Sequence, residues 1–200
     1  MAQYYLETPI REEEIRRLKV GDILYVSGTM FTARDEAHHR ALEYRKQGIK
    51  LPIDFRGLVL YHCGPIVKRE NETWKIVAAG PTTSMRMEKL EDEFIREFGI
   101  RVVVGKGGMG PKTTKAMNDY GAVYAAYTGG AAVLAARAIK RVERAEWLDL
   151  GIPEALYILN VERFGPTIVA IDAHGENLYE RVSEDVEKRK KKIYRDIESK

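Results

Sequence analysis

Two glycine-rich turns constrain the fold of this chain more than any other feature. Gly80–Met87 and Gly105–Lys112 each follow a short apolar run and each precede a helical pattern. A strand that turns directly into a helix leaves main-chain N–H groups without partners, and such groups can hold an anion. Each turn also contains a cation, Arg86 in the first and Lys106 in the second. We therefore predict one site for a ligand with more than one negative group.

Composition limits the class of protein. A chain of 200 residues with 44% hydrophobic content can bury a core, and its formal charge of +3 is too small for a broadly basic protein. The excess charge lies in Lys188–Lys192, which we interpret as a solvated helix face and not as a nucleic-acid contact. The sequence shows neither a membrane-spanning run nor a signal-peptide pattern. We predict a cytoplasmic location, with no membrane partner and no nucleic-acid partner.

The single cysteine excludes several kinds of site. Cys63 alone cannot form an internal disulfide, a cysteine-rich zinc site or a complete iron–sulfur site. It ends a strand-like run, so we expect a buried core thiol and not a nucleophile. The four histidines lack the paired helical spacing of a zincin, and we predict no metal site in this chain.

Hydrophobic periodicity predicts an α/β chain in which strands alternate with helices. The expected helices cover residues 12–18, 33–47, 86–98, 113–120, 130–139 and 178–200. The expected strands cover residues 21–29, 57–62, 65–68, 74–79, 100–104, 122–127, 141–145, 155–161 and 167–172, with a turn at 71–72. Gly48 and Gly99 are expected to end helices. We predict one domain over residues 1–177, followed by a charged C-terminal helix over residues 178–200.

Neither glycine turn fits a known phosphate-binding motif. The glycines of the second turn do not have the GxGxxG spacing, and Gly110 is followed by Pro111 and Lys112 where a Walker A loop requires Lys and Ser or Thr. The glycines alone therefore do not distinguish an anion site from a tight connection without a ligand.

Five segments, in the same order, resemble the β subunit of class I fumarate hydratases. The same segment forms the C-terminal half of single-chain class I fumarases and the small subunit of L-tartrate dehydratases. The resemblance covers about Gly21 to Gly175. Its motifs are Gly21–His38, Ala79–Glu88, Val104–Met109, Tyr127–Ala132 and Leu148–Ala155.

This resemblance implies a hydro-lyase that adds water to a C=C bond flanked by carboxylates. In that family three cysteines of the other half hold a [4Fe–4S] cluster, whose open iron acts as a Lewis acid on the substrate. Cys63 alone cannot hold this cluster, so the resemblance implies that a fumarate hydratase α subunit ligates it and that the heteromer is α2β2. It also implies a layered β/β/α domain of the swivelling type with a mixed sheet.

The family's site residues correspond to four positions of this sequence. Arg34 and Arg86 resemble the arginines that bind the substrate carboxylates, a role that suits the paired donors of a guanidinium. Lys106 resembles the lysine beside the same dianion. Thr82 resembles the residue that serves as the base for the C3 proton, and a threonine hydroxyl needs strong activation for that role. Thr83 is a second candidate donor to a carboxylate, or only a helix cap.

Other assignments stay open. Asp35 and His38 could hold Arg34 in position, or Asp35 could cap the following helix. Arg34 could instead be a surface residue that pairs with Asp35 or Glu36. Gly129–Gly130 is expected to allow close packing of a helix. Met109 stands where relatives often carry a polar residue, which bears on specificity. The alternatives to fumarate hydration are the same chemistry on tartrate or another 2-hydroxy dicarboxylate, and an anion-binding regulatory module that needs no partner.

Overall fold

The computed structural model describes residues 1–71 and 73–198. Its strands are β1 (Gln3–Glu7), β2 (Ile23–Thr32), β3 (Val59–Tyr61), β4 (Ile66–Glu70), β5 (Thr73–Ala78), β6 (Val102–Gly105), β7 (Val123–Ala126), β8 (Ile139–Glu146) and β9 (Leu156–Ile171). Its α-helices are α1 (Glu12–Ile15), α2 (Asp35–Gln47), α3 (Glu88–Phe98), α4 (Pro111–Tyr120), α5 (Ala132–Ala138) and α6 (Leu178–Glu198). Short 3-10 turns are η1 (Ser84–Met87), η2 (Gly129–Ala131) and η3 (Leu148–Leu150).

The main sheet has seven strands in the order β1-β2-β3-β6-β7-β9-β8, and β2 also pairs with β9. The first five strands in this order are parallel, whereas β9 runs antiparallel to each of its neighbours. Because β9 pairs with both β7 and β2, the sheet closes on itself. The predicted α/β class and mixed sheet are confirmed, and the closure was not predicted.

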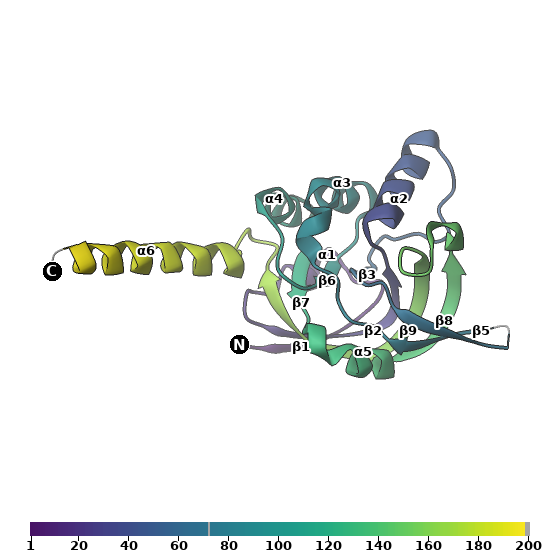
Figure 1. The fold of residues 1–200 in the computed structure, drawn as a ribbon. Coiled ribbons are helices and arrows are strands. Elements are labelled where there is room, and N and C mark those ends of the chain that lie inside the picture. The colour runs from purple at the N-terminus through teal and green to yellow at the C-terminus, as the bar shows by residue number, and fades with distance from the viewer. Residues whose placement is uncertain (72, 199–200) are drawn as a thin grey trace.

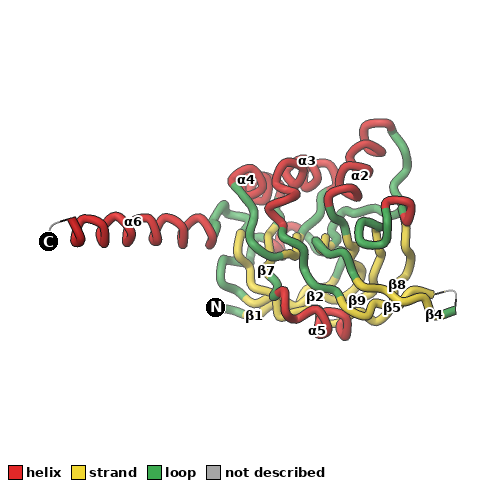
Figure 2. Tube along the Cα trace, viewed as in Figure 1, coloured by secondary structure: helices red, strands yellow, loops and turns green. Residues whose placement is uncertain are grey.

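Helices and a hairpin cover the strands from two sides. α2, α3 and α4 lie together above the strands, α5 lies below them, and the β4–β5 hairpin packs beside β8 and projects to the right of the view (Figure 1, Figure 2). The buried hydrophobic residues form two clusters, one on each face of the sheet. Along each central strand the residues alternate between them: Val102 and Val104 belong to one cluster, whereas Val103 belongs to the other, which lies under α2, α3 and α4. This period of two is the geometry of a strand buried on both faces, and it explains the continuous apolar runs in the sequence.

Several predicted boundaries need correction. Strand β1 was missed, and the predicted strands 155–161 and 167–172 are parts of one 16-residue strand, β9. Arg163 has a positive φ of 50° within β9, and Gly165–Pro166 lies close behind it, so the polar break in the sequence is an irregularity inside one strand and not a loop. Helix α2 begins at Asp35 and not at Ala33.

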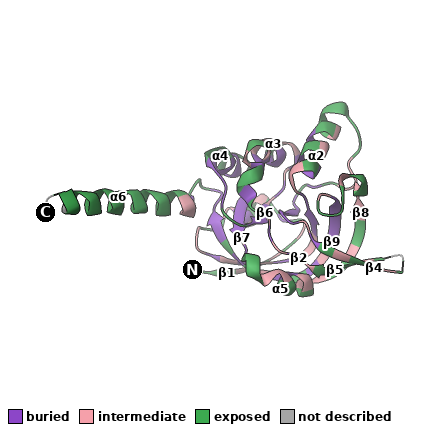
Figure 3. Ribbon diagram, viewed as in Figure 1, coloured by how far each residue is buried: buried purple, intermediate pink, exposed green. Residues whose placement is uncertain are grey.

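Other local predictions are confirmed. Gly48 and Gly99 occupy the left-handed region, with φ of 70° and 61°, at the ends of α2 and α3. The predicted helix at 86–98 is the η1 turn followed by α3. The turn predicted at 71–72 includes position 72, which lies outside the described residues. The charged C-terminal helix is present as α6 and is exposed over nearly its whole length (Figure 3). No helix in the described part of the chain has the length and apolar content to cross a membrane.

Candidate functional site

The candidate site lies where parallel strands of the main sheet end. Arg34 follows the end of β2 and is the residue before the first turn of α2. Lys106 follows β6 directly, and Arg86 lies in η1. Because parallel strands end at the same edge of a sheet, segments that are far apart in the sequence meet there.

Main-chain hydrogen bonds join the two glycine turns. Thr82 N–H donates to His62 O at 2.6 Å, Lys106 N–H donates to Thr82 O at 3.3 Å, and Ser84 N–H donates to Lys106 O at 2.9 Å. Thr83 and Lys106 form an isolated β-bridge. The structure therefore places Thr82, Thr83 and Lys106 side by side, as the sequence predicted for a single site.

An ion pair brings Arg86 to the start of α2. Its Nη2 lies 2.7 Å from Asp35 Oδ2, and Asp35 is adjacent to Arg34 in the chain. The alternative role of Asp35 as a helix cap is wrong, because the side chain binds Arg86 and no side chain caps α2. All five predicted residues therefore belong to one edge of the sheet.

Arg34 is held by residues that the sequence interpretation missed. Its Nε lies 3.1 Å from Glu154 Oε1, a charge contact that lacks hydrogen-bond alignment, and Glu154 Oε2 accepts the Glu36 N–H at 3.2 Å. Arg34 is therefore not a surface residue paired with Asp35 or Glu36. A methyl group at Gly64 would lie 2.7 Å from Arg34 Nη1, so this glycine leaves the space that the guanidinium occupies.

The α4 end of the second glycine turn does not offer free N–H groups to a ligand. The carboxylate of Glu88 accepts Gly110 N–H at 2.7 Å, Lys112 N–H at 3.2 Å and Thr113 N–H at 3.3 Å. An anion does bind at the N-terminus of α4, but that anion belongs to the chain itself. The N-terminus of α4 is therefore occupied and does not form the predicted main-chain anion site, whereas Lys106 remains a candidate for binding a ligand.

The glycines after β7 have another role than the predicted one. Gly129 and Gly130 are exposed, and a methyl group at Gly130 would meet nothing within 4 Å, so they do not allow close helix packing. A methyl group at Gly129 would lie 3.6 Å from Lys106 Nζ, which places the lysine side chain beside this turn. The close approach occurs instead at Gly80, where a methyl group would lie 3.3 Å from Ala132 Cβ. Met109 is buried in the core under the helices and does not face the site.

A fully buried ionic cluster lies behind the site. Glu91 Oε2 of α3 is 2.9 Å from His62 Nε2 and 3.3 Å from His38 Nε2, and all three side chains are 0% exposed. His62 Nδ1 is 2.9 Å from Ser84 Oγ, which also accepts the Tyr124 hydroxyl at 3.1 Å. The sequence contained one signal of this cluster that the prediction missed: Glu91 lies in the middle of the apolar face of its helix.

One assignment of protons fits the cluster. Burial lowers the pKa of His62, against the attraction of Glu91, so His62 is neutral and its Nε2–H donates to Glu91. His38 Nδ1 must donate to Arg34 O at 2.7 Å, because a carbonyl oxygen only accepts. His38 Nε2 faces Glu91 Oε2 at 3.3 Å without hydrogen-bond alignment. Burial alone would raise the pKa of Glu91, but the two histidines outweigh it and hold that pKa at about 2.

The same three side chains are the one group of potential metal ligands found in the described part of the chain. The 2.9 Å between His62 Nε2 and Glu91 Oε2 is a hydrogen-bond length, whereas ligand atoms of a tetrahedral zinc ion lie about 3.3 Å apart. We therefore interpret the cluster as a hydrogen-bonded support. It holds Arg34 through its carbonyl, Thr82 through His62 O, and the η1 turn through Ser84.

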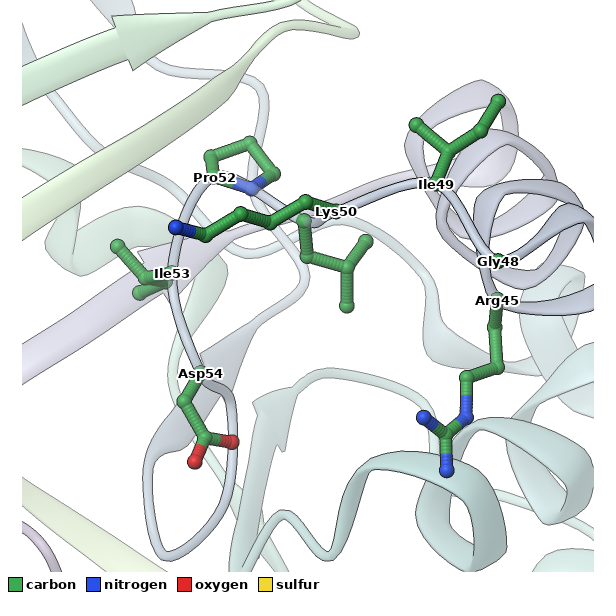
Figure 4. A pocket seen from close by; sticks show the side chains of 8 residues that line it. Arg45, Gly48, Ile49, Lys50, Pro52, Ile53 and Asp54 are labelled. Carbon is green, nitrogen blue, oxygen red and sulfur yellow. The ribbon is translucent and has the colours of Figure 1, made fainter.

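A separate hollow on the surface is not part of this site. It has a volume of about 380 Å³ and lies between the end of α2 and the segment that leads to β3 (Figure 4). Its charged residues are Arg45, Lys50 and Asp54, and Arg45 already pairs with Glu97 at 3.4 Å. None of the five predicted site residues lines it.

Comparison with known proteins identifies the family. Residues 2–182 match the family model described as Fumarase C-terminus. The chain belongs to this family. It is 47% identical over 183 residues to a Methanocaldococcus jannaschii protein provisionally named L(+)-tartrate dehydratase subunit beta, covering 91% of this chain and 94% of the relative. It is 44% identical to the Escherichia coli K12 L(+)-tartrate dehydratase subunit beta, covering 86% and 85%.

A longer relative matches at the same level. The chain is 44% identical to a Geobacillus stearothermophilus protein provisionally named fumarate hydratase class I, covering 92% of this chain but 34% of that protein. The family predicted from the sequence is thus confirmed as a fumarase C-terminus family that includes tartrate dehydratase β subunits. The residues of this chain do not form a ligand set for an iron–sulfur cluster. Its single cysteine, Cys63, is 0% exposed, and burial raises the pKa of the thiol to about 12.

Proposed function

We propose that this chain is the β subunit of a two-subunit hydro-lyase that hydrates fumarate to malate. One observation carries the proposal: Arg34, Arg86 and Lys106 lie at one edge of the sheet with Thr82 and Thr83, and the single cysteine of the sequence, Cys63, is buried beside Pro81. The chain supplies cations for a dicarboxylate and no ligands for a cluster. An α subunit would therefore hold the [4Fe–4S] cluster in an α2β2 complex, and a cytoplasmic location stays a prediction.

The proposed role of each residue follows from charge development during the reaction. Removal of the C3 proton places extra negative charge on the neighbouring carboxylate. Fixed cations stabilise this charge, and the loss of one such contact raises the barrier by about 2.7–4 kcal/mol. Arg34 and Arg86 would bind the two carboxylates, with Lys106 as a point charge and Thr83 as an added donor. Thr82 would accept the proton, and its main chain is held by His62 O at 2.6 Å.

L-tartrate is the second candidate substrate, because two of the compared relatives carry tartrate dehydratase names. Tartrate differs from malate by one hydroxyl group. No residue at this edge distinguishes the two, so the same residues would serve either reaction. A regulatory anion-binding module is the candidate outside enzymology, and it predicts dicarboxylate binding without a partner.

The test is co-expression of the chain with its α subunit under anaerobic conditions, followed by assays of fumarate hydration and L-tartrate dehydration. In the active complex we expect Arg86→Ala to lower kcat/KM by about 10²–10³. Arg11→Ala is the matched control, since Arg11 is exposed and, within the described part of the chain, forms an ion pair with Glu14 of its own turn alone. A cluster-containing complex that acts on no dicarboxylate would overturn the proposal.

A further inference from the structure

Helix α6 extends away from the body of the molecule. It covers Leu178–Glu198 and projects to one side, with contacts to the body only near its first turn (Figure 1). There, the Tyr179 ring lies 6.3 Å from the Tyr124 ring, and Asn177 Oδ1 accepts the Tyr179 N–H at 3.0 Å. A helix of this length spans about 30 Å. The match to the family ends at residue 182, so most of α6 lies beyond what the family shares.

One side of α6 is an exposed apolar stripe. Val182 and Val186 are 52% and 53% exposed, and Ile193 and Ile197 are 57% and 63% exposed. These spacings place all four on one face of a helix. A single helix that exposes such a face is marginal in water, because helices in proteins are stabilised mainly by packing of that face. A hollow of about 410 Å³ lies on the stripe, lined by Val186, Ile193, Tyr194 and the stems of Arg189 and Lys190.

Charges of opposite sign occupy the two halves of α6. The N-terminal half is mainly acidic, with Glu180, Glu184, Asp185 and Glu187 against Arg181. The C-terminal half is mainly basic, with Lys188, Arg189, Lys190, Lys191, Lys192 and Arg195 against Asp196 and Glu198. The apolar stripe is also symmetric: Val182 and Ile197 are equally far from the point between Arg189 and Lys190, and so are Val186 and Ile193.

We propose that α6 pairs antiparallel with α6 of a second copy of this chain. In that arrangement Val182 packs against Ile197 of the second copy, and Val186 against Ile193 of the second copy. Each acidic half lies along a basic half, which favours the pair, whereas a parallel pair would place the two basic halves together. The two-fold axis passes between Arg189 and Lys190, whose aliphatic stems cover the centre of the stripe.

Cysteine cross-linking of the full-length chain tests the orientation. Cys63 is buried, so an introduced cysteine on α6 is the reactive thiol. Lys190→Cys lies beside the proposed axis and is expected to form a disulfide-linked dimer. Val182→Cys alone is expected to stay uncross-linked, but a mixture of Val182→Cys and Ile197→Cys chains should form a mixed dimer. A homodimer cross-linked through Val182→Cys, or no cross-link in any of these samples, overturns the proposal.

Charge exchange tests the pairing in a second way. One chain carries Glu184→Lys, Asp185→Lys and Glu187→Lys, and the other carries Lys190→Glu, Lys191→Glu and Lys192→Glu. Each chain alone should lose at least tenfold in dimer affinity by sedimentation, and an equal mixture should regain it. If each variant alone keeps the wild-type dissociation constant, the helices do not pair through these charges.

The complex with the α subunit provides the remaining control. The Lys190→Cys cross-link should form in that complex as well, with circular dichroism and hydro-lyase activity unchanged, because no residue of α6 belongs to the candidate site. Protection of α6 from cross-linking by the α subunit would show that the α subunit, and not a second copy, covers the stripe. That result would also overturn the proposal.

Discussion

Glu91→Gln tests the buried ionic cluster behind the site. The substitution keeps the shape of the side chain and one acceptor for His62, but it removes the charge. The pKa of Glu91 lies at about 2 in the folded chain against an ordinary 4.5. This difference corresponds to roughly 3 kcal/mol of stability at neutral pH. We expect the variant to lose stability of that order, which would lower its urea midpoint by about 1 M.

The pH dependence gives the sign of the effect. Because the pKa of Glu91 is lower in the folded chain than in the unfolded chain, its contribution is complete above about pH 4.5. It is lost as the pH falls from there toward 2. The difference in free energy of unfolding between wild type and Glu91→Gln should therefore be largest at pH 7 and should shrink between pH 4.5 and 2.

The matched control is Glu93→Gln on the same helix. Glu93 is 30% exposed and lies 3.2 Å from Lys46 Nζ, so its loss should change stability by less than about 0.5 kcal/mol. Both variants are measured by urea unfolding of the full chain, followed by circular dichroism at pH 7 and pH 3. If Glu91→Gln is as stable as Glu93→Gln at pH 7, or if its deficit is the same at both pH values, the cluster does not stabilise the ionised form of Glu91.

Three further predictions concern the site. Thr82→Val should lower kcat of the complex by about 10²–10⁴ with little change in KM, whereas Thr82→Ser should retain part of the activity; equal losses in both would exclude the hydroxyl as a base. Gly64→Ala should raise KM for the dicarboxylate by displacing Arg34, and Gly130→Ala, with open space around it, should leave KM unchanged. Cys63 should resist iodoacetamide at pH 8 in the folded chain, because burial raises its thiol pKa to about 12, and should react in urea; rapid labelling of the folded chain would contradict its burial.

Local sequence signals predicted the local parts of this fold. Gly48 and Gly99 end helices because each adopts a left-handed conformation that costs glycine little. Apolar periodicity likewise located α3 and the central strands. Strand β1 was missed because its alternating, half-exposed pattern is short and is completed only by pairing with β2. Closure of the sheet by β9 depends on long-range register, which no local pattern encodes.

The candidate site was likewise predicted only in part from the sequence. The resemblance named Arg34, Arg86 and Lys106, and the structure brings them to one edge. The carboxylates that hold this edge, Glu88 and Glu154, could not be predicted, because each binds groups 22 or more positions away in the chain. An acid that satisfies a distant helix terminus looks like any exposed glutamate in a sequence.

Internal ion pairs also decide how the isolated chain should bind a dicarboxylate. Arg34 and Arg86 are each compensated by an acid of the chain, Glu154 and Asp35, whereas Lys106 has no ion pair among the described residues. A dicarboxylate would therefore meet only one uncompensated cation at this edge, and we expect a dissociation constant above about 1 mM for malate or fumarate by isothermal titration. Micromolar binding by the isolated chain would instead favour the regulatory module. Weak binding means that the remaining attraction must come from the partner subunit, so the arginines orient a substrate that this chain alone cannot retain.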